Sequence, residues 1–83
     1  LPLVTADADR VSEGYVDLAF REPAGWVLVD YKSDRDPSAE AVAGYERQVR
    51  TYASMLRKTG EPVVEGYLLF TADGREHPVP LDP

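Results

Sequence analysis

The chain has 83 residues, of which 43% are hydrophobic and 29% are charged. A chain of this length forms one domain and buries only ~60% of the surface that its unfolded form exposes, which excludes a large enzyme core. Fifteen acidic residues against nine basic ones give a net charge of −6, which argues against a broad positive face for nucleic acid.

The chain contains no cysteine, which excludes a disulfide framework and a thiolate zinc site and favours a reducing, cytoplasmic location. No run approaches the ~20 apolar residues of a membrane span, so no membrane partner is expected. The sequence opens with Leu1 and carries no signal-peptide pattern. We therefore expect residues 1–83 to be a single domain that is a fragment of a longer protein.

Two strands are predicted in the first half of the chain, with a further short strand over residues 1–5. Residues 13–21 alternate as a strand does, and residues 26–32, after a turn at 22–25, are rich in β-branched and aromatic side chains. The apolar residues that alternate along the earlier strand are Val16, Leu18 and Phe20. Two strands joined by so short a turn should form a hairpin.

The register of this hairpin decides which polar residues meet. If Arg21 pairs with Trp26, Asp17 lies directly across from Asp30. Their Cβ atoms would then be roughly 4.5–5.5 Å apart.

A helix is predicted from Pro37 to about Lys58, with Asp36 or Ser38 as its N-cap and Gly60 just beyond its C-terminus. Gly44 weakens it, so a break or a late start there is an alternative. The residues at helical spacing that should form its buried stripe are Val42, Tyr45, Val49, Tyr52, Ala53 and Leu56.

The last third of the chain predicts a strand over residues 63–71 and a second one over 75–81, joined by a two-residue turn at Asp73 and Gly74. Two prolines confine the final strand to a sheet edge, where His77 should be exposed. The core residues expected from the strands are Phe20, Trp26, Leu68 and Phe70. Strands, one long helix and further strands predict an α+β fold with a sheet packed on a helix.

Polar residues inside the second strand point to a site. Asp30 and Lys32 are two positions apart and share a face, which the hairpin register extends to Asp17. Two opposed carboxylates repel each other unless a positive charge lies between them. Mg²⁺ takes one or two carboxylates together with water and phosphate oxygens, so Asp17, Asp30 and the carbonyl of Tyr31 are candidate metal ligands. Lys32 would reach the phosphate or the attacking water, an arrangement suited to phosphodiester hydrolysis.

Three segments resemble, in order, the core motifs of the RecB-type branch of the PD-(D/E)XK nucleases. They are Gly-Tyr-Val-Asp at 14–17, Val-Asp-Tyr-Lys-Ser-Asp at 29–34 and Gln-Val-Arg-Thr-Tyr at 48–52. The resemblance runs from about Val11 to Phe70. It is strongest to the C-terminal nuclease domains of bacterial helicase-nucleases such as RecB and AddA.

The resemblance implies a role for each matching residue. Asp17 and Asp30 match the two metal-binding aspartates, and Lys32 matches the catalytic lysine that positions water and stabilises developing charge. Gln48 and Tyr52 match the Gln-x-x-x-Tyr motif, whose helix borders the site and shapes its contacts with DNA. The implied fold is a restriction-endonuclease-like core with a mixed β-sheet and one long helix.

The resemblance also implies an activity and partners. The activity is that of a Mg²⁺- or Mn²⁺-dependent deoxyribonuclease of exonuclease type, in DNA repair and recombination in the bacterial cytoplasm. The partners are DNA, helicase domains of the same longer chain and, as a further candidate, a second subunit. The family's additional histidine or glutamate ligand, on an upstream helix, has no match here, and His77 does not replace it, so the core is expected to be truncated at its N-terminal helix.

Other interpretations remain open. A nuclease-fold module that binds DNA or protein without cutting is one, and a small α+β interaction domain with Asp17 far from Asp30 is another. Glu13 and Asp34 flank the motifs; contact with a metal through water is one interpretation of them, and solvated acids are the expectation. The basic residues of the helix, Arg47, Arg50, Arg57 and Lys58, form either a phosphate-facing patch or a favourable complement to the helix dipole.

Overall fold

The structure, a computed structural model, describes residues 16–81 and contains a mixed four-stranded sheet and one helix. The elements in chain order are β1 (Leu18–Glu22), β2 (Gly25–Lys32), α3 (Ala39–Lys58), β3 (Val63–Phe70) and β4 (Arg75–Pro78). The strands lie side by side in the order β1-β2-β3-β4. The predicted α+β class, with one long helix and a mixed sheet, is confirmed at this level.

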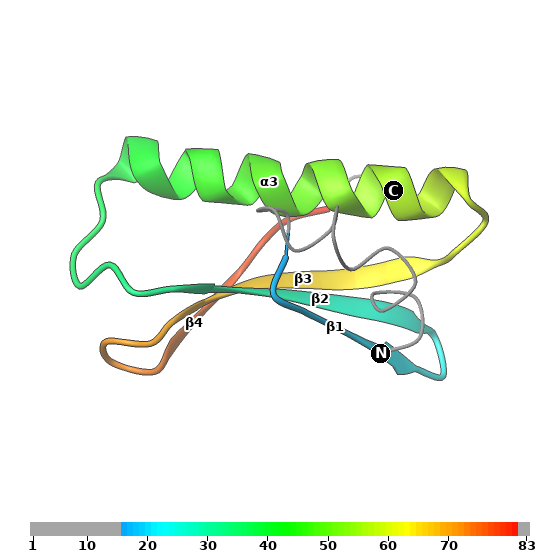
Figure 1. Cartoon of the computed structure of the whole chain (residues 1–83), viewed down its shortest axis with the longest axis horizontal. Helices are drawn as coiled ribbons and strands as arrows, with labels where there is room; N and C mark the ends of the chain where they lie inside the picture. The colour runs from blue at the N-terminus through cyan, green and yellow to red at the C-terminus, as the bar shows by residue number, and fades with distance from the viewer. Residues whose placement is uncertain (1–15, 82–83) are drawn as a thin grey trace.

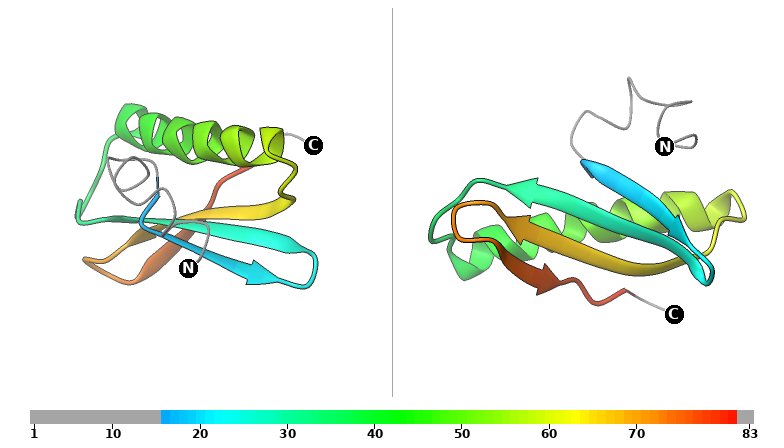
Figure 2. Two further views of the ribbon diagram at one scale, coloured as in Figure 1. Left: turned by 45° about the vertical axis from the view of Figure 1, so that its right-hand side comes forward. Right: turned by 90° about the horizontal axis from the view of Figure 1, so that it is seen from below.

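The helix connects the only parallel pair of strands in the described sheet. β2 and β3 are parallel, whereas β1–β2 and β3–β4 are antiparallel hairpins. Parallel neighbours need a long crossover, and α3 is that crossover, lying along one face of the sheet (Figure 1). None of the described elements covers the opposite face (Figure 2). Within residues 16–81 no helix is long and apolar enough to cross a membrane.

The β1–β2 hairpin has the predicted register, with Arg21 opposite Trp26. The pairing extends one residue further towards the turn than predicted. Glu22 pairs with Gly25, so the turn has two residues instead of four. Gly25 has a φ of 154°, and a Cβ there would lie 2.7 Å from the carbonyl oxygen of Pro62. This close approach requires glycine. It lets Trp26 N–H donate to the same oxygen at 2.7 Å.

The expected strand over residues 13–21 is confirmed over residues 18–21, but it is wrong for residues 16 and 17. β1 begins at Leu18, so Val16 and Asp17 precede it. Residues 13–15, and the short strand expected over 1–5, lie outside the described residues. The expected core face is also wrong, because Ala19 is fully buried towards α3 while Phe20 is half-buried on the uncovered face. Side chains alternate along a strand, so only one of these two can face the helix.

Helix α3 begins at Ala39 rather than Pro37, because Ser38 is extended and caps it. The Ser38 hydroxyl accepts a hydrogen bond from the N–H of Ala41 at 3.0 Å, which settles the choice of cap. The helix runs through Gly44 without a break, and Gly60 follows it with a φ of 90°, as expected. The helical residues that are fully buried are Val49, Tyr52, Ala53 and Leu56, whereas Val42 and Tyr45 pack at the margin of the core.

The β3–β4 connection is longer, and its final strand shorter, than predicted. Phe70 pairs with Arg75, so the loop has four residues, 71–74, instead of two. β4 ends at Pro78 and lies at the sheet edge as predicted, although the Val79 N–H still donates to the carbonyl oxygen of Gly66 at 2.8 Å. Pro80, the next proline, has no N–H with which to extend the ladder. Trp26, Leu68 and Phe70 are buried as expected.

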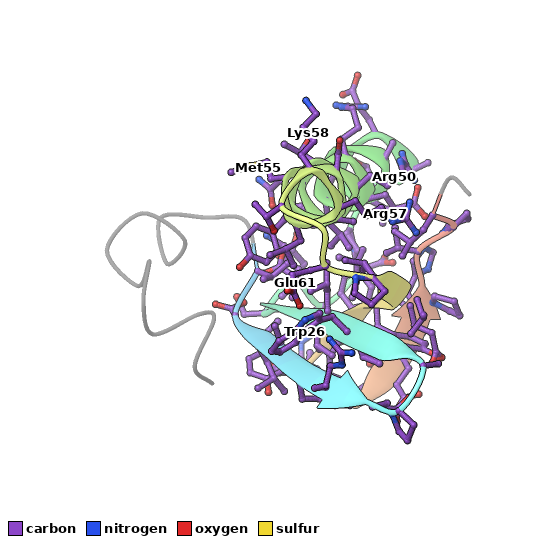
Figure 3. The ribbon with its side chains drawn as sticks, turned by 90° about the vertical axis from the view of Figure 1, so that its right-hand side faces the viewer. Trp26, Arg50, Met55, Arg57, Lys58 and Glu61 are labelled. Carbon is purple, nitrogen blue, oxygen red and sulfur yellow. The ribbon has the colours of Figure 1, made fainter. Side chains whose placement is uncertain are left out.

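The far end of the helix is fastened to the sheet by polar contacts. Trp26 Nε1 donates to Glu61 Oε1 at 2.7 Å, and Arg21 donates to the same oxygen at 3.3 Å. Arg57 donates to the carbonyl oxygen of Val63 at 2.7 Å. Figure 3 shows Trp26 and Glu61 directed towards each other beneath the end of α3. These bonds hold α3 at a fixed height over the sheet.

The close packing of α3 against Gly66 of β3 predicts a stability effect. A Cβ on Gly66 of β3 would lie 2.8 Å from Val49 Cγ1, and both residues are buried. We expect Gly66→Ala to lower the free energy of unfolding by ~1–3 kcal/mol, because α3 must shift to make room. Urea denaturation followed by circular dichroism measures this.

The matched control is the same substitution in α3. The nearest atom to a Cβ on Gly44 is Arg47 Nη2 at 3.5 Å, an ordinary contact. We expect Gly44→Ala to stabilise the chain by ~0.5–1 kcal/mol through helix propensity. Equal stabilities for the two variants would contradict this packing.

Candidate active site

The predicted polar residues meet at the end of β2 that leads into α3. Asp30 and Lys32 project from β2 towards the helix, and Gln48 reaches down from α3. Asp17 stands just before β1, on the side of β2 away from β3. The candidate site therefore lies between the sheet and the first half of the helix, at the left in Figure 1.

Asp17 is tied to the backbone of β2. Its N–H donates to the carbonyl oxygen of Val29 at 3.2 Å, and its Oδ2 accepts from the N–H of Tyr31 at 2.8 Å. The N–H and C=O of one strand residue point to the same neighbouring strand. The carbonyl of Tyr31 is consequently directed to the side on which the Asp17 carboxylate lies.

Asp30 is the buried charge of the described structure, with 4% of its surface exposed. Its Oδ2 lies 3.0 Å from Lys32 Nζ, an ion-pair distance, yet this buried oxygen accepts no hydrogen bond of good geometry. Burial, followed by the neighbouring Asp17 carboxyl, raises the pKa of Asp30 from 3.8 to about 6, although Lys32 acts in the opposite direction. The Asp30 carboxylate thus has too little neighbouring positive charge and too few hydrogen-bond donors to offset its burial.

The Lys32 ammonium has three neighbours. Besides Asp30, it donates to Gln48 Oε1 at 3.2 Å and lies 4.2 Å from the centre of the Tyr45 ring. An ammonium has only donors, so the oxygen of the Gln48 amide, rather than its nitrogen, must face it. The structure therefore joins Gln48 to the same cluster as Asp30 and Lys32.

Tyr52 lies one helical turn beyond Gln48 and is 2% exposed. It belongs to the hydrophobic core between α3 and the sheet. Its part in the fold is thus visible, whereas the role in shaping an active site that the motif implies stays a prediction.

Two residues of the cluster were not predicted as site residues. Tyr45 was expected in the buried stripe and Asp34 as a solvated acid, but the Tyr45 hydroxyl donates to Asp34 Oδ2 at 2.6 Å. This hydrogen bond raises the pKa of Tyr45, which remains a neutral donor. The sequence feature that could have indicated Tyr45 is its spacing, because it precedes Gln48 by three positions and shares its helix face.

His77 is not the exposed edge residue that its sequence position suggests. It is half-buried, its Nε2 lies 2.8 Å from Glu46 Oε2, and its ring packs edge-on against Phe70. The helix packs mainly on β3 and β2, and the long side chain of Glu46 reaches from it to the edge strand. His77 is absent from the contacts of the Asp30 cluster.

The basic residues of α3 do not all lie on one side of the helix. Arg50 donates to the carbonyl oxygen of Pro80 at 3.4 Å, and Arg57 donates to the Val63 backbone. Figure 3 shows Lys58 pointing away from the sheet, on the opposite side of the helix axis from Arg57. The macrodipole explanation fits Arg57 and Lys58, which both lie in the last turn.

Asp17 and Asp30 are the carboxylates that the candidate site brings together. Within residues 16–81, no group of three or more His, Cys, Asp or Glu side chains is arranged to hold a metal ion. Asp17 and Asp30 form a pair, and the Tyr31 carbonyl is the further oxygen on their side.

Comparisons with known proteins give similar relatives of one kind. The chain is 34% identical over 82 residues to an ATP-dependent helicase/nuclease subunit of Levilactobacillus brevis, with 89% of this chain covered. It is 37% identical over 70 residues (81% covered) to the protein of that name from Clostridium botulinum, and 41% over 66 residues (74% covered) to that from Alkaliphilus metalliredigens. Neither a family model nor a solved structure matches the chain.

The chain spans 6% of the length of each of these relatives. It is thus similar to a short segment of helicase/nuclease subunits, in agreement with the resemblance to helicase-nucleases that its motifs indicate. The narrower assignment to a PD-(D/E)XK nuclease domain stays a prediction.

The raised pKa of Asp30 predicts how stability depends on pH. Between about pH 4 and 6 the folded chain holds a proton on Asp30 that the unfolded chain has released, so the free energy of unfolding falls as pH rises through this window. We expect a contribution of ~1–2 kcal/mol, after allowance for solvent screening.

Asp30→Asn removes this contribution, and the difference between the wild-type and variant unfolding curves isolates it. Asp73→Asn, in the exposed loop of residues 71–74, is the control substitution. Parallel wild-type and Asp30→Asn curves from pH 4 to 7 would show that burial does not perturb Asp30.

Proposed function

We propose that this chain is a metal-dependent nuclease module of a helicase-nuclease and hydrolyses DNA phosphodiesters. The observation that carries the proposal is the buried Asp30, with Asp17 and Lys32 beside it, in a segment similar to part of the helicase/nuclease subunits. Burying a carboxylate next to a second one does not stabilise a fold. Such an arrangement is expected at a site that needs concentrated negative charge.

The residues present fit a hard divalent cation such as Mg²⁺ or Mn²⁺. Asp30 Oδ2 is a buried acceptor without a hydrogen bond, and Asp17 supplies a second, exposed carboxylate. Mg²⁺ uses one or two carboxylates and keeps several waters, so Asp17, Asp30 and the Tyr31 carbonyl would suffice as its protein ligands. When bound, such an ion makes water a better nucleophile and offsets phosphate charge.

The remaining residues of the cluster would act on the phosphate. Lys32 carries the single positive charge of the cluster and would stabilise the charge that develops on the phosphoryl oxygens. Gln48 keeps the ammonium at the sheet through its 3.2 Å hydrogen bond. Tyr52 anchors the helix that presents Gln48, because it is buried one turn further along.

We further propose that the fold is the restriction-endonuclease-like core of the RecB-type PD-(D/E)XK nucleases, with residues 1–83 as one unit. The order of strands and helix and the three motifs support this. The proposed partners are DNA, helicase domains of a longer chain and a second subunit, which the words "helicase" and "subunit" in the names of the relatives favour. Exonuclease activity in DNA repair and recombination is part of the same proposal.

A catalytically inactive nuclease-fold module that binds DNA or protein is the second candidate. The contacts of Arg50 and Arg57 with the backbone favour it, because the basic residues of α3 then contribute little to a continuous DNA-binding face. The intact set of Asp17, Asp30 and Lys32 favours the nuclease.

Separate measurements of metal binding and cleavage test the proposal. We expect the chain to bind Mn²⁺ in calorimetric titrations and to cut single-stranded DNA in its presence. Lys32→Met should retain Mn²⁺ binding, because Asp17 and Asp30 remain, but should slow cleavage by roughly 10²-fold or more, because the positive charge that acts on the phosphate is lost. Asp30→Asn should lose both binding and cleavage.

The chain offers matched controls for both substitutions. Lys58 is the other lysine of the sequence and is exposed, so Lys58→Met should cut as wild type does. Glu22→Gln neutralises an exposed acid at the distant hairpin turn. Undiminished cleavage by Lys32→Met would refute the nuclease assignment, and Mn²⁺ binding without any cleavage would favour the inactive module.

A further inference from the structure

The ring of Tyr45 is placed over the ammonium of Lys32. The Nζ atom lies 4.2 Å from the ring centre, well within the ~6 Å over which a ring face attracts a cation. Tyr45 is half-buried on α3, and Lys32 is half-buried at the end of β2. Partial burial strengthens such a contact, because less water competes for the ammonium.

The ring is itself held from a second side. The Tyr45 hydroxyl donates to Asp34 Oδ2 at 2.6 Å, and Asp34 belongs to the loop between β2 and α3. A hydrogen bond to an ionised acceptor is short and strong, so it restricts rotation of the ring about its side-chain bonds. Donation to a carboxylate also increases electron density on the ring, which strengthens its attraction for a cation.

The other contacts of Lys32 do not fix its ammonium firmly. A lysine ammonium sits on a flexible four-carbon stem and has no fixed direction of its own. In this structure the ammonium forms an ion pair with Asp30 and donates a hydrogen bond to Gln48. A cation held by Asp30 would weaken the attraction of that carboxylate for Lys32, and Gln48 and the Tyr45 ring would then be the main restraints on the ammonium.

We propose that Tyr45, fixed by Asp34, is a positioning residue that keeps the Lys32 ammonium in place for its action on phosphate. This inference rests on the proposed nuclease function. Tyr45 is not a catalytic residue in this scheme, since it contacts the lysine rather than the reacting atoms.

Two substitutions separate the ring from the hydroxyl. Tyr45→Phe keeps the ring face over Lys32 and removes the hydrogen bond to Asp34, whereas Tyr45→Leu removes the ring but keeps an apolar side chain. We expect Tyr45→Leu to lower kcat by about 3- to 30-fold with little change in KM. The loss in Tyr45→Phe should be much smaller, and Asp34→Ala, which removes the acceptor of the same hydrogen bond, should resemble Tyr45→Phe.

A spectroscopic measurement tests the contact without metal or DNA. The sequence contains two lysines, so ¹³C-labelled lysine gives one ε-methylene signal for Lys32 and one for the exposed Lys58. The current in the Tyr45 ring should move the Lys32 signal upfield of the Lys58 reference. The shift should persist in Tyr45→Phe and disappear in Tyr45→Leu, and the Lys32→Met variant assigns the signals.

The outcomes distinguish this inference from the proposed function. A Lys32 signal without an upfield shift in the wild-type chain overturns the positioning role, whether or not Tyr45→Leu folds. Equal kcat losses in Tyr45→Phe and Tyr45→Leu also overturn it, because the ring would then be irrelevant. An intact shift in a chain that never cuts DNA overturns the proposed function instead, and Tyr45 is then only a structural partner of Lys32.

Discussion

The burial of one carboxylate organises this end of the molecule. Asp30 follows a run of apolar residues in β2, and only 4% of its surface is exposed. The positive charge paired with it is Lys32, two residues further along the same strand. The neighbouring Asp17 adds repulsion rather than relief. A well-packed apolar residue at such a position is often as stabilising as a buried ion pair, or more so, which supports the proposal that the charge of Asp30 serves a site.

The fold brings the remaining groups to Asp30 through one connection. Because α3 links the parallel strands β2 and β3, it must run back along the sheet, and its first half then stands over the end of β2. Tyr45 and Gln48 are three positions apart and both meet the same ammonium. The contacts of Glu61 and Arg57 at the other end keep the helix from rolling, and the distances around Lys32 depend on that.

The sequence predicted the parts of the fold that depend on local pattern. Turn residues and β-branched runs located the hairpin, and the pairing of Arg21 with Trp26 followed from the turn, so the meeting of Asp17 with the backbone beside Asp30 was foreseeable. The face of β1 was mispredicted, because apolar residues occupy both of its faces. Only the closeness of α3 selects the small Ala19 over the larger Phe20. The contact of His77 with Glu46 could not be predicted from the sequence for a similar reason, because it depends on where the helix crosses the sheet.

The contact between Tyr45 and Lys32 shows the same limit within the site. Helical spacing marks Tyr45 as a core residue, and nothing local distinguishes a tyrosine over a lysine from one in the core. The rotation of α3 about its axis decides the matter, and that rotation is a property of the packed structure. The motif residues Asp30, Lys32 and Gln48 were accessible from sequence because their spacing in the chain is itself the signal.

The most direct test of this account is a nuclear magnetic resonance titration of the Asp30 side-chain carboxyl carbon, with and without Mg²⁺. The account predicts a pKa of about 6 in the absence of metal, set by burial and by Asp17, and a clear decrease when Mg²⁺ is added, because the cation favours the ionised carboxylate. A pKa near the ordinary value of 3.8 that Mg²⁺ leaves unchanged would contradict it.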